Sequence, residues 1–362
     1  MKKTIAPLLL ISLLIACSPG TESTEAFYTM DDFKKVKKID THVHIRTENE
    51  NFVNSAKANN FQLVTIVVDS RSSWDWVKSS YDFMVLQTKK NPETVQFATS
   101  IAMEGWDDEG WLENSLSWID SSLDDGAIGI KFWKNIGMVY RDKDSALVML
   151  DDPGFDPIFD MLEAKDIPVV GHLAEPYNCW LPVEEMTTKN DSGYFSRNPQ
   201  YHMYKHPEMP SHADQMLARD NRLAKNPNLR FIGAHMASLE YDVDELAMRF
   251  DRFPNITVDL AARMGQVFYQ TANNYDKVRD FFIKYQDRLI YATDLGDSGS
   301  QSAEEVNAEN AEVWMRDWKF FVTDDTMTSD LIDQEFKGLK LPKEVVAKLF
   351  HDNAVRAFKI FE

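Results

Sequence analysis

Cysteine is almost absent from this chain of 362 residues, which contains only Cys17 and Cys179. Two cysteines allow at most one disulfide, so the fold must depend on its hydrophobic core, and a chain of this length can build one. Basic residues are also few, because 39 Lys and Arg stand against 58 Asp and Glu, a formal net charge of −19. This imbalance argues against nucleic acid and against anionic membrane surfaces as partners.

Apolar runs of membrane-spanning length are missing as well. Near the N-terminus, two lysines precede a short apolar stretch, 5–15, which is typical of an export signal. The stretch ends in Leu-Ile-Ala-Cys, 14–17, which resembles the lipobox of bacterial lipoproteins. We expect residues 1–16 to be a lipoprotein signal peptide, Cys17 to be lipidated, and residues 17–30 to be a flexible tether. The alternative is a plain secretory signal cleaved near Ala16, with Cys17 incidental.

This N-terminus predicts a location. A lipidated Cys17 places the protein in the bacterial cell envelope, anchored to a membrane by its lipid. Ser18 after Cys17 favours the outer membrane, facing the periplasm. Only Cys179 then remains in the body of the chain, so an intrachain disulfide is excluded.

Apolar, β-like runs alternate with helical stretches over the remaining residues, 31–362. Eight runs fit buried strands: 39–45, 62–68, 95–101, 127–133, 167–173, 230–235, 256–260 and 289–293. This alternation predicts an α/β fold with a parallel sheet, and eight repeats predict a closed (β/α)₈ TIM barrel in one domain. A long loop insertion, 175–212, is expected after the fifth strand, and a second one at about 296–310. A closing helix is expected over 341–361.

Four histidines and Asp294 lie within these runs or at their ends. His42 and His44 are two residues apart on a strand, where side chains alternate, so both imidazoles share one face. His172, His235 and Asp294 each end a later apolar run, and the ends of barrel strands meet on one face. This set predicts an open, catalytic site for a divalent metal.

Four motifs in this order carry a resemblance. They are His-Val-His at 42–44, Val-Gly-His-Leu-Ala-Glu-Pro at 170–176, Phe-Ile-Gly-Ala-His-Met at 231–236 and Tyr-Ala-Thr-Asp at 291–294. With them, the chain resembles the amidohydrolase superfamily. The run 255–263, followed by 281–294, is similar to the amidohydrolase-related (amidohydrolase 2) family of metal-dependent TIM-barrel hydrolases and decarboxylases. The resemblance covers roughly residues 39–358.

The resemblance implies roles for the five residues. His42, His44, His172 and Asp294 would be the metal ligands, and three imidazoles with one carboxylate suit one Zn²⁺ per chain, or Mn²⁺ or Fe²⁺. The metal would lower the pKa of a bound water, and Asp294 could take the proton. His235 would polarise the substrate or shuttle a proton.

Lys131, at the end of the fourth strand, allows three interpretations. In dinuclear amidohydrolases a lysine from this strand is carboxylated and bridges two metals, with the second ion held by His172 and His235. Members of the family that this chain most closely resembles generally use one metal. This favours a cationic Lys131 that faces the substrate. The third interpretation is a structural ion pair with Asp259.

Other polar residues are assigned by position. Glu175 is a candidate substrate contact or loop anchor, and Arg263 is a candidate clamp for a carboxylate, or else a partner of a surface acid. Asp40 is expected to orient a ligand imidazole. His202, His206 and His212 are expected at the rim or in solvent. His351 is expected to make a structural contact of the closing helix.

These residues predict a metal-dependent hydrolase that attacks a lactone, amide or ester of a small acid, such as a sugar-derived or aromatic one, with metal-activated water. The alternative is a metal-dependent decarboxylase on the same site. An alternative of another class is a non-catalytic binding lipoprotein on the same barrel. The expected partner is a small molecule, and the oligomeric state stays open.

Overall fold

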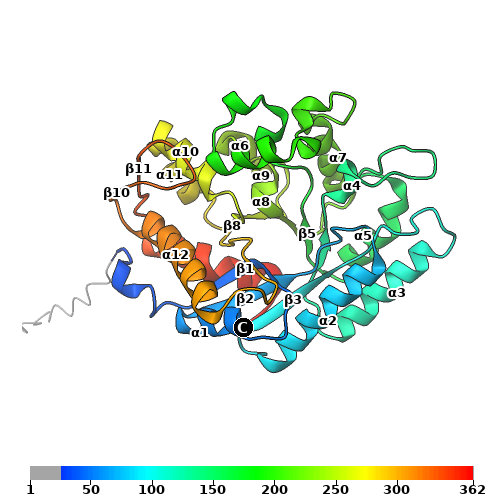
Figure 1. Cartoon of the computed structure of the whole chain (residues 1–362), viewed down its shortest axis with the longest axis horizontal. Helices are drawn as coiled ribbons and strands as arrows, with labels where there is room; N and C mark the ends of the chain where they lie inside the picture. The colour runs from blue at the N-terminus through cyan, green and yellow to red at the C-terminus, as the bar shows by residue number, and fades with distance from the viewer. Residues whose placement is uncertain (1–25, 362) are drawn as a thin grey trace, which may run out of the picture.

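The computed structural model of the chain describes residues 26–361 (Figure 1). The predicted signal peptide, the lipidated Cys17 and most of the tether lie outside these residues. At 26–30, the end of the predicted tether, the chain contacts the body of the protein. The Lys343 N–H donates to the Ala26 carbonyl oxygen at 3.0 Å, and Trp318 Nε1 donates to the Thr29 carbonyl oxygen at 3.0 Å. Residues 26–30 therefore pack against the body of the protein.

The eight predicted strands are present, each at its predicted place. They pair in parallel and in chain order, which confirms the α/β class and the TIM-barrel arrangement. Several are shorter than the apolar runs that predicted them. Their bounds are β1 Lys38–Ile45, β2 Phe61–Ile66, β3 Val95–Ser100, β4 Ile130–Phe132, β5 Val169–Gly171, β6 Phe231–Gly233, β7 Ile256–Asp259 and β8 Leu289–Ile290.

The residues after β8 close the barrel against β1. The Thr41 N–H donates to the Tyr291 carbonyl oxygen at 3.3 Å, and the His44 N–H donates to the Leu295 carbonyl oxygen at 2.8 Å. β9 (Gly296–Asp297) then pairs in parallel with the end of β1. Because β8 pairs with β7 on its other side, the segment 289–297 joins the first and last strands of the sheet.

Helices surround the strands (Figure 1). Those that follow the strands are amphipathic: in α9, for example, Val243, Leu246 and Phe250 recur at helical spacing and are buried. The bounds are α1 Asn51–Ala58, α2 Trp74–Lys90, α3 Trp111–Asp124, α4 Asn135–Met138, α5 Asp156–Ala164, α6 Lys189–Arg197, α7 His212–Lys225, α8 Ala234–Ala237, α9 Val243–Arg252, α10 Met264–Asn273, α11 Tyr275–Lys284, α12 Ala303–Val322, α13 Lys343–Ala347 and α14 Asn353–Phe358.

A core cluster inside the barrel draws one or two apolar side chains from most strands. It is covered at one end by the C-terminal segment, where Phe358 and Ile360 pack on the strand residues. The strand members are Ile39, Val64, Ile66, Ala98, Val170, Ile232 and Ile290. The predicted closing helix is present here as α13, a π-helical turn (Lys348–Asp352) and α14.

Two predicted insertions differ from expectation. The segment 175–212 carries α6 and four short 3₁₀ helices: Tyr177–Trp180, Val183–Glu185, Pro199–Tyr201 and Met203–Lys205. The segment 296–310 is largely regular, because β9 occupies its start and α12 begins at Ala303. Ser302 caps α12 in a capping box with Glu305, a sequence signal for the start of a helix. A small antiparallel pair, β10 (Thr326–Met327) and β11 (Phe336–Lys337), follows α12.

Among residues 26–361, no helix combines the length and the apolar composition that crossing a bilayer requires.

Candidate metal centre

β1 supplies His42 and His44, and each ring is fixed by a hydrogen bond at its Nδ1 atom. His42 Nδ1 donates to Asp259 Oδ2 at 2.8 Å, and His44 Nδ1 donates to the Ile66 carbonyl oxygen at 2.9 Å. Because these oxygens only accept, Nδ1 carries the proton in both neutral rings. The Nε2 lone pair of each ring therefore faces the other members of the site.

Asp294 brings a carboxylate to these two rings just after β8. Its Oδ1 lies 3.0 Å from His44 Nε2 and 3.6 Å from His42 Nε2. The backbone of Asp294 has a positive φ of 71°, and its N–H donates to the His42 carbonyl oxygen at 2.8 Å. A non-glycine residue in this conformation costs about 1–3 kcal/mol, so the contacts around it must hold it in place.

His172 directly follows β5, and its ring packs against His235, with 4.0 Å between the ring centroids. His235 Nδ1 donates to the Ala261 carbonyl oxygen at 2.8 Å, so its Nε2 accepts from His172 Nδ1 at 3.1 Å. His172 Nε2 is then a buried acceptor without a hydrogen-bond partner among residues 26–361. Gly171, just before His172, leaves room for the Phe231 ring of β6, because a Cβ there would lie 2.2 Å from that ring.

A left-handed turn after β6 presents His235. Residues 235–238 all have φ between 56° and 59°. Asp259 Oδ1 accepts the His235 N–H at 2.7 Å, and Ser238 Oγ donates to the Leu173 carbonyl oxygen at 2.7 Å. Four successive non-glycine residues in this region are strained, and these hydrogen bonds hold the turn.

The donor atoms of His42, His44 and Asp294 fit a divalent cation. One ligand atom from each lies within 4.8 Å of the others. In the neutral form of His44, its Nε2 and Asp294 Oδ1 are both acceptors, so their 3.0 Å contact is favourable only with a proton on Nε2 or a metal cation between the two atoms. Imidazole nitrogen with carboxylate oxygen suits Zn²⁺, Mn²⁺ or Fe²⁺. The residues present therefore fit the metal that the family implies.

His172, the expected third imidazole ligand, is not in this group of three. Its Nδ1 contacts His235 instead, and only its unpartnered Nε2 is left to bind anything further. A second possible group, His42, His235 and Asp259, is already joined by the hydrogen bonds given above.

Burial and charge set the ionisation of the site. Burial, and then the charge of a neighbouring lysine, lowers the pKa of His42, and burial lowers the pKa of His172 and His235 far more. Burial alone would raise the pKa of Asp294, but the contact with His44 and the nearby positive charges bring it well below its usual value. Neutral imidazoles and an ionised carboxylate are the forms that bind metals.

Lys131, in the middle of β4, is completely buried, and its Nζ lies 3.3 Å from His42 Nε2. Burial lowers the pKa of Lys131 to about 8. Among residues 26–361, no ion pair within 4.0 Å joins it to Asp259, whose carboxylate is taken by His42 and by backbone N–H groups. The interpretation of Lys131 as a structural partner of Asp259 has no such contact to support it.

A cavity of about 470 Å³ opens beside these residues, and His172, His235 and Asp294 are part of its lining. Glu175 and Arg263, the two predicted substrate contacts, also line it. Five of the residues selected from the sequence therefore line one cavity.

The two predicted contacts are held differently. Glu175 forms an ion pair with Lys134, which follows β4. Arg263 is buried, with 7% of its side chain exposed, and its Nη1 donates to the Ala262 carbonyl oxygen at 3.0 Å. Its Nε lies 3.9 Å from Glu240 Oε2, beyond hydrogen-bonding distance, and neither atom has a hydrogen-bond partner in the part of the chain that the structure describes. Glu175 thus anchors the segment after β5, whereas part of the Arg263 guanidinium stays available.

Two predictions about other polar residues were wrong. Asp40 orients no imidazole: it accepts hydrogen bonds from Thr293 and from Trp314 Nε1 in α12, at 2.6 and 2.9 Å. A register shift between Asp40 and Val43 breaks the alternation along β1, so Asp40 and His42 do not share a face.

His202 and His212 do not lie at the rim. Both are buried, and they donate to the Leu181 and Ser238 carbonyl oxygens, each at 2.7 Å. His206 is partly exposed and lines a neighbouring cavity, as expected of a rim residue.

Asp259 has a role in the site that the sequence did not indicate. It fixes the His42 tautomer and also the turn at His235. The available signal was its place at the end of an apolar run, like His172 and Asp294.

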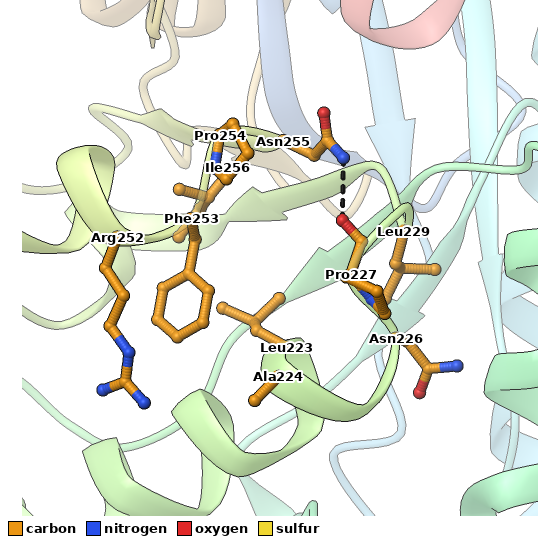
Figure 2. A pocket seen from close by; sticks show the side chains of 10 residues that line it. All are labelled: Leu223, Ala224, Asn226, Pro227, Leu229, Arg252, Phe253, Pro254, Asn255 and Ile256. Atoms are coloured by element: carbon orange, nitrogen blue, oxygen red, sulfur yellow. Dashed lines mark hydrogen bonds between the residues drawn. The ribbon is translucent and has the colours of Figure 1, made fainter.

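A separate hollow of about 240 Å³ lies elsewhere on the barrel (Figure 2). It is lined by the end of α7, the segment after α9 and the first residue of β7, and Asn255 Nδ2 donates to the Pro227 carbonyl oxygen across it at 2.8 Å. The site residues follow the opposite, C-terminal ends of the strands. This hollow is therefore not part of the metal centre.

Comparison with known families identifies the class of protein. Residues 93–360 match the family model described as Amidohydrolase, that of the amidohydrolase-2 family. The match covers well over half of the chain, so this protein belongs to that family, as the motifs predicted. It is thus an enzyme of a metal-dependent family. Among curated proteins, none matches the chain.

Solved structures share the fold. The 2,6-dihydroxybenzoate decarboxylase from Rhizobium has a TM-score of 0.53 at 13% identity, covering 90% of this chain and 99% of its own. An amidohydrolase II has a TM-score of 0.50 at 15% identity, with 89% and 100% covered. The 5-carboxyvanillate decarboxylase from Novosphingobium aromaticivorans, solved with bound manganese, has a TM-score of 0.50 at 14% identity, with 91% and 99% covered. At these identities the likeness establishes the barrel and not the reaction.

Proposed function

We propose that this protein is a metal-dependent decarboxylase of a small carboxylic acid. The observation that carries the proposal is the buried Arg263, which lines the cavity beside the histidine cluster. Within the described residues, 26–361, its Nε has no hydrogen-bond partner. Its acidic neighbour, Glu240, compensates it only partly, because burial raises the pKa of Glu240 to about 7. A buried guanidinium with a free donor favours an anion in the cavity, and a carboxylate matches its planar fork.

The residues of the site then divide the work. His42, His44 and Asp294 would hold the metal, with His172 proposed as a further ligand through its unpartnered Nε2. The bound metal would supply a Lewis acid that draws electron density from a substrate oxygen. Arg263 would bind the carboxylate of the substrate and hold the substrate in the cavity.

Decarboxylation breaks the bond between the carboxylate carbon and its neighbour. Carbon dioxide leaves, and the electron pair left on the neighbouring carbon takes a proton. Asp294, with 31% of its side chain exposed, lies on the cavity and can relay that proton from water. The buried ammonium of Lys131 lies beside the same cluster, and we propose that it stabilises the negative charge that develops. His235, whose ring N–H donates to the Ala261 carbonyl oxygen, would hold the His172 ring in place.

The names of two fold relatives agree with this choice. Both the Rhizobium and the Novosphingobium proteins are decarboxylases of substituted benzoic acids by name. We propose an aromatic or similar planar acid as the substrate class on this basis. Zn²⁺ and Mn²⁺ are both suitable metals for the donor set.

Hydrolysis of a lactone, amide or ester is the second candidate, and one observation favours it. Asp294 is ionised and partly exposed, which is what removal of a proton from an attacking water requires. The two reactions have different products, so product analysis separates them.

The test is a panel of hydroxybenzoic acids, other small carboxylic acids and lactones, incubated with the metal-loaded protein in ¹⁸O-water. We expect release of carbon dioxide and a product that, in D₂O, carries one deuteron at the former carboxylate position. Incorporation of ¹⁸O without carbon dioxide would establish the hydrolase instead. Bound metal with no turnover on the whole panel would favour a binding protein without catalysis.

Arg263→Gln tests the residue that carries the proposal. We expect it to raise KM for the acid by about 10-fold to 100-fold, the usual loss for a charge-assisted hydrogen bond. Arg197→Gln is the matched control, because Arg197 lines the same cavity from the end of α6 but is exposed. Equal effects of the two substitutions would contradict the assignment of Arg263.

Attachment to the cell envelope stays a proposal that depends on residues 1–17. We propose a lipid at Cys17 and a position on the outer membrane facing the periplasm. Metabolic labelling with a radioactive fatty acid should label the wild type and not Cys17→Ser. Labelling of neither, with the protein released into the soluble periplasmic fraction, would show a plain secretory signal.

A further inference from the structure

A second, larger cavity adjoins the one at the metal centre. It has a volume of about 610 Å³, against about 470 Å³ for the first. We call it the annex and define it by its main apolar lining: Trp133, Met138, Val139, Tyr201, Met203 and Met209. Lys134, Glu175 and Tyr194 line both cavities, so the annex begins where the metal-centre cavity ends.

The annex is built largely by the segment that lengthens this chain after β5. Tyr201, Met203 and Met209 come from that segment, and Val139 follows the short α4. Methionine side chains adapt their shape to a ligand, and tyrosine rings give flat apolar contact at low entropic cost. The lining therefore suits a planar, apolar group.

Much of this apolar surface is exposed. Val139 is 59% exposed and Tyr201 is 46% exposed, and both are among the few large apolar residues that reach the surface in the described chain. The rings of Tyr194 and Tyr201 are nearly parallel, at 9°, with centroids 6.4 Å apart. Exposed apolar groups gathered around a cavity indicate a ligand that covers them.

An arginine without an acidic partner stands at the annex. Arg71 lines it, and its guanidinium lies 3.9 Å from the centroid of the Trp76 ring, while that of Arg46 lies 3.7 Å from the same ring. Among residues 26–361, neither arginine has a carboxylate within 4.0 Å. Two guanidinium groups on one indole repel each other, and an anion near them would relieve that repulsion.

One of the two acidic residues of the annex is paired. Glu175 pairs with Lys134, whereas Glu208 lies 3.5 Å from His206 Nδ1 with 67% of its side chain exposed, so its charge faces solvent. Arg71 is the basic residue of the annex without a carboxylate within 4.0 Å among residues 26–361. Arg71 and the apolar lining together favour an apolar ring system that ends in an anion.

We propose that the annex is a second substrate subsite, which binds a planar apolar group bearing a carboxylate or sulfonate that pairs with Arg71. The substrate then has two parts: the reacting acid lies in the metal-centre cavity, and the second, anionic ring lies in the annex. This proposal depends on the proposed function in one respect: it takes the reacting acid and the anionic ring as two parts of one substrate molecule. The binding of a ring anion in the annex stands without any turnover.

The probe is 8-anilinonaphthalene-1-sulfonate, which carries two ring systems and one sulfonate. Its fluorescence is titrated with the purified protein, once with metal and once after chelation. We expect saturable binding in both states, weakened about tenfold by Arg71→Gln and at least as much by Val139→Trp, which fills the mouth of the annex. Leu217→Trp, at an equally exposed position outside the annex, should change nothing.

The apolar hollow of Figure 2 supplies the remaining control, since it also carries an arginine, Arg252. Weakening by Arg252→Gln and not by Arg71→Gln would place the probe in that hollow and overturn the proposal. No effect of Arg71→Gln and Val139→Trp would overturn it too. An effect of Val139→Trp alone would overturn its anionic part, and with it the two-part substrate as stated.

A competition experiment tests the second anion directly. Naphthalene-2,6-dicarboxylate should displace the probe at about tenfold lower concentration than naphthalene-2-carboxylate does, and Arg71→Gln should abolish that difference. Equal displacement by the two acids in the wild type would overturn the proposal. Neither the titration nor the competition requires catalysis. Failure of the annex proposal is therefore distinguishable from failure of the proposed decarboxylase.

Discussion

Substitution of Asp259 by asparagine should weaken metal binding although Asp259 is not expected to be a ligand. Its carboxylate is buried and accepts three hydrogen bonds: from His42 Nδ1 at 2.8 Å, from the His235 N–H at 2.7 Å and from the Ala261 N–H at 3.2 Å. The side-chain oxygen of asparagine can keep the two backbone donors. Its amide NH₂ group then faces His42 Nδ1, which is also a donor.

The imidazole can satisfy that amide only by moving its proton to Nε2. This removes the lone pair that His42 directs toward His44 and Asp294. Loss of such an orienting partner costs about 10-fold to 100-fold in metal affinity, or ~1.4–2.7 kcal/mol. We also expect the metal-free protein to lose about 1.5–3 kcal/mol of stability, because a charge-assisted hydrogen bond is lost.

The assay is a competition titration of Zn²⁺ and of Mn²⁺ against a chelator, at one pH, with the circular dichroism spectrum as a check on folding. Asp317→Asn is the matched control, because Asp317 is equally buried and accepts from the Tyr291 hydroxyl at 3.0 Å, away from the histidines. It should lower stability and leave metal affinity unchanged. A folded Asp259→Asn protein with wild-type metal affinity would refute the tautomer argument.

Three further outcomes follow from the packing and the ionisation of the barrel. Gly171→Ala should lower the free energy of unfolding by about 1–3 kcal/mol, because its Cβ would meet the Phe231 ring at 2.2 Å, whereas Gly110→Ala, whose Cβ would meet nothing closer than 3.5 Å, should be tolerated. Thermal unfolding measures both, and equal melting temperatures would contradict the first. Burial lowers the pKa of His212 to about 4, below its value of 6.5 in the unfolded chain, so the unfolded state binds more protons between these values. Stability contributed by neutral His212 is present above pH 6.5 and is lost as the pH falls toward 4, by about 3 kcal/mol in all. Chemical denaturation at pH 7 and pH 4.5 should therefore show a smaller pH effect in His212→Gln, and an equal effect would contradict the assignment. Lys131→Gln should lower kcat by at least about 100-fold while the metal content per chain stays the same, and loss of half of the metal would show instead that a carboxylated Lys131 bridges two ions.

The barrel could be predicted because each strand is a short apolar run, and such runs are visible without any tertiary information. The spacing of His42 and His44 and the ends of three later strands likewise placed five polar residues at one end of the barrel. Closure of the sheet by the segment after β8 brings Asp294 to those histidines, as strand order alone requires.

Other features depend on tertiary contacts that a single sequence does not show. The register shift in β1 sends Asp40 to Trp314, and no residue in that strand marks it. The sequence suggested Asp259 only in one of three interpretations of Lys131, as its ion-pair partner. Its actual contacts, with the His42 ring and the His235 N–H, join strands that are far apart in the sequence. The helices of segment 175–212 and the burial of His202 and His212 depend on packing within a polar, proline-containing stretch.

The most direct test of the account is the metal content of the purified protein. Elemental analysis, on protein prepared without chelators and beside a His42→Ala/His44→Ala variant, should find about one zinc or manganese ion per chain in the wild type and none in the variant. Absence of metal from the wild type, even after incubation with Zn²⁺ or Mn²⁺, would contradict the metal centre and the reaction proposed for it.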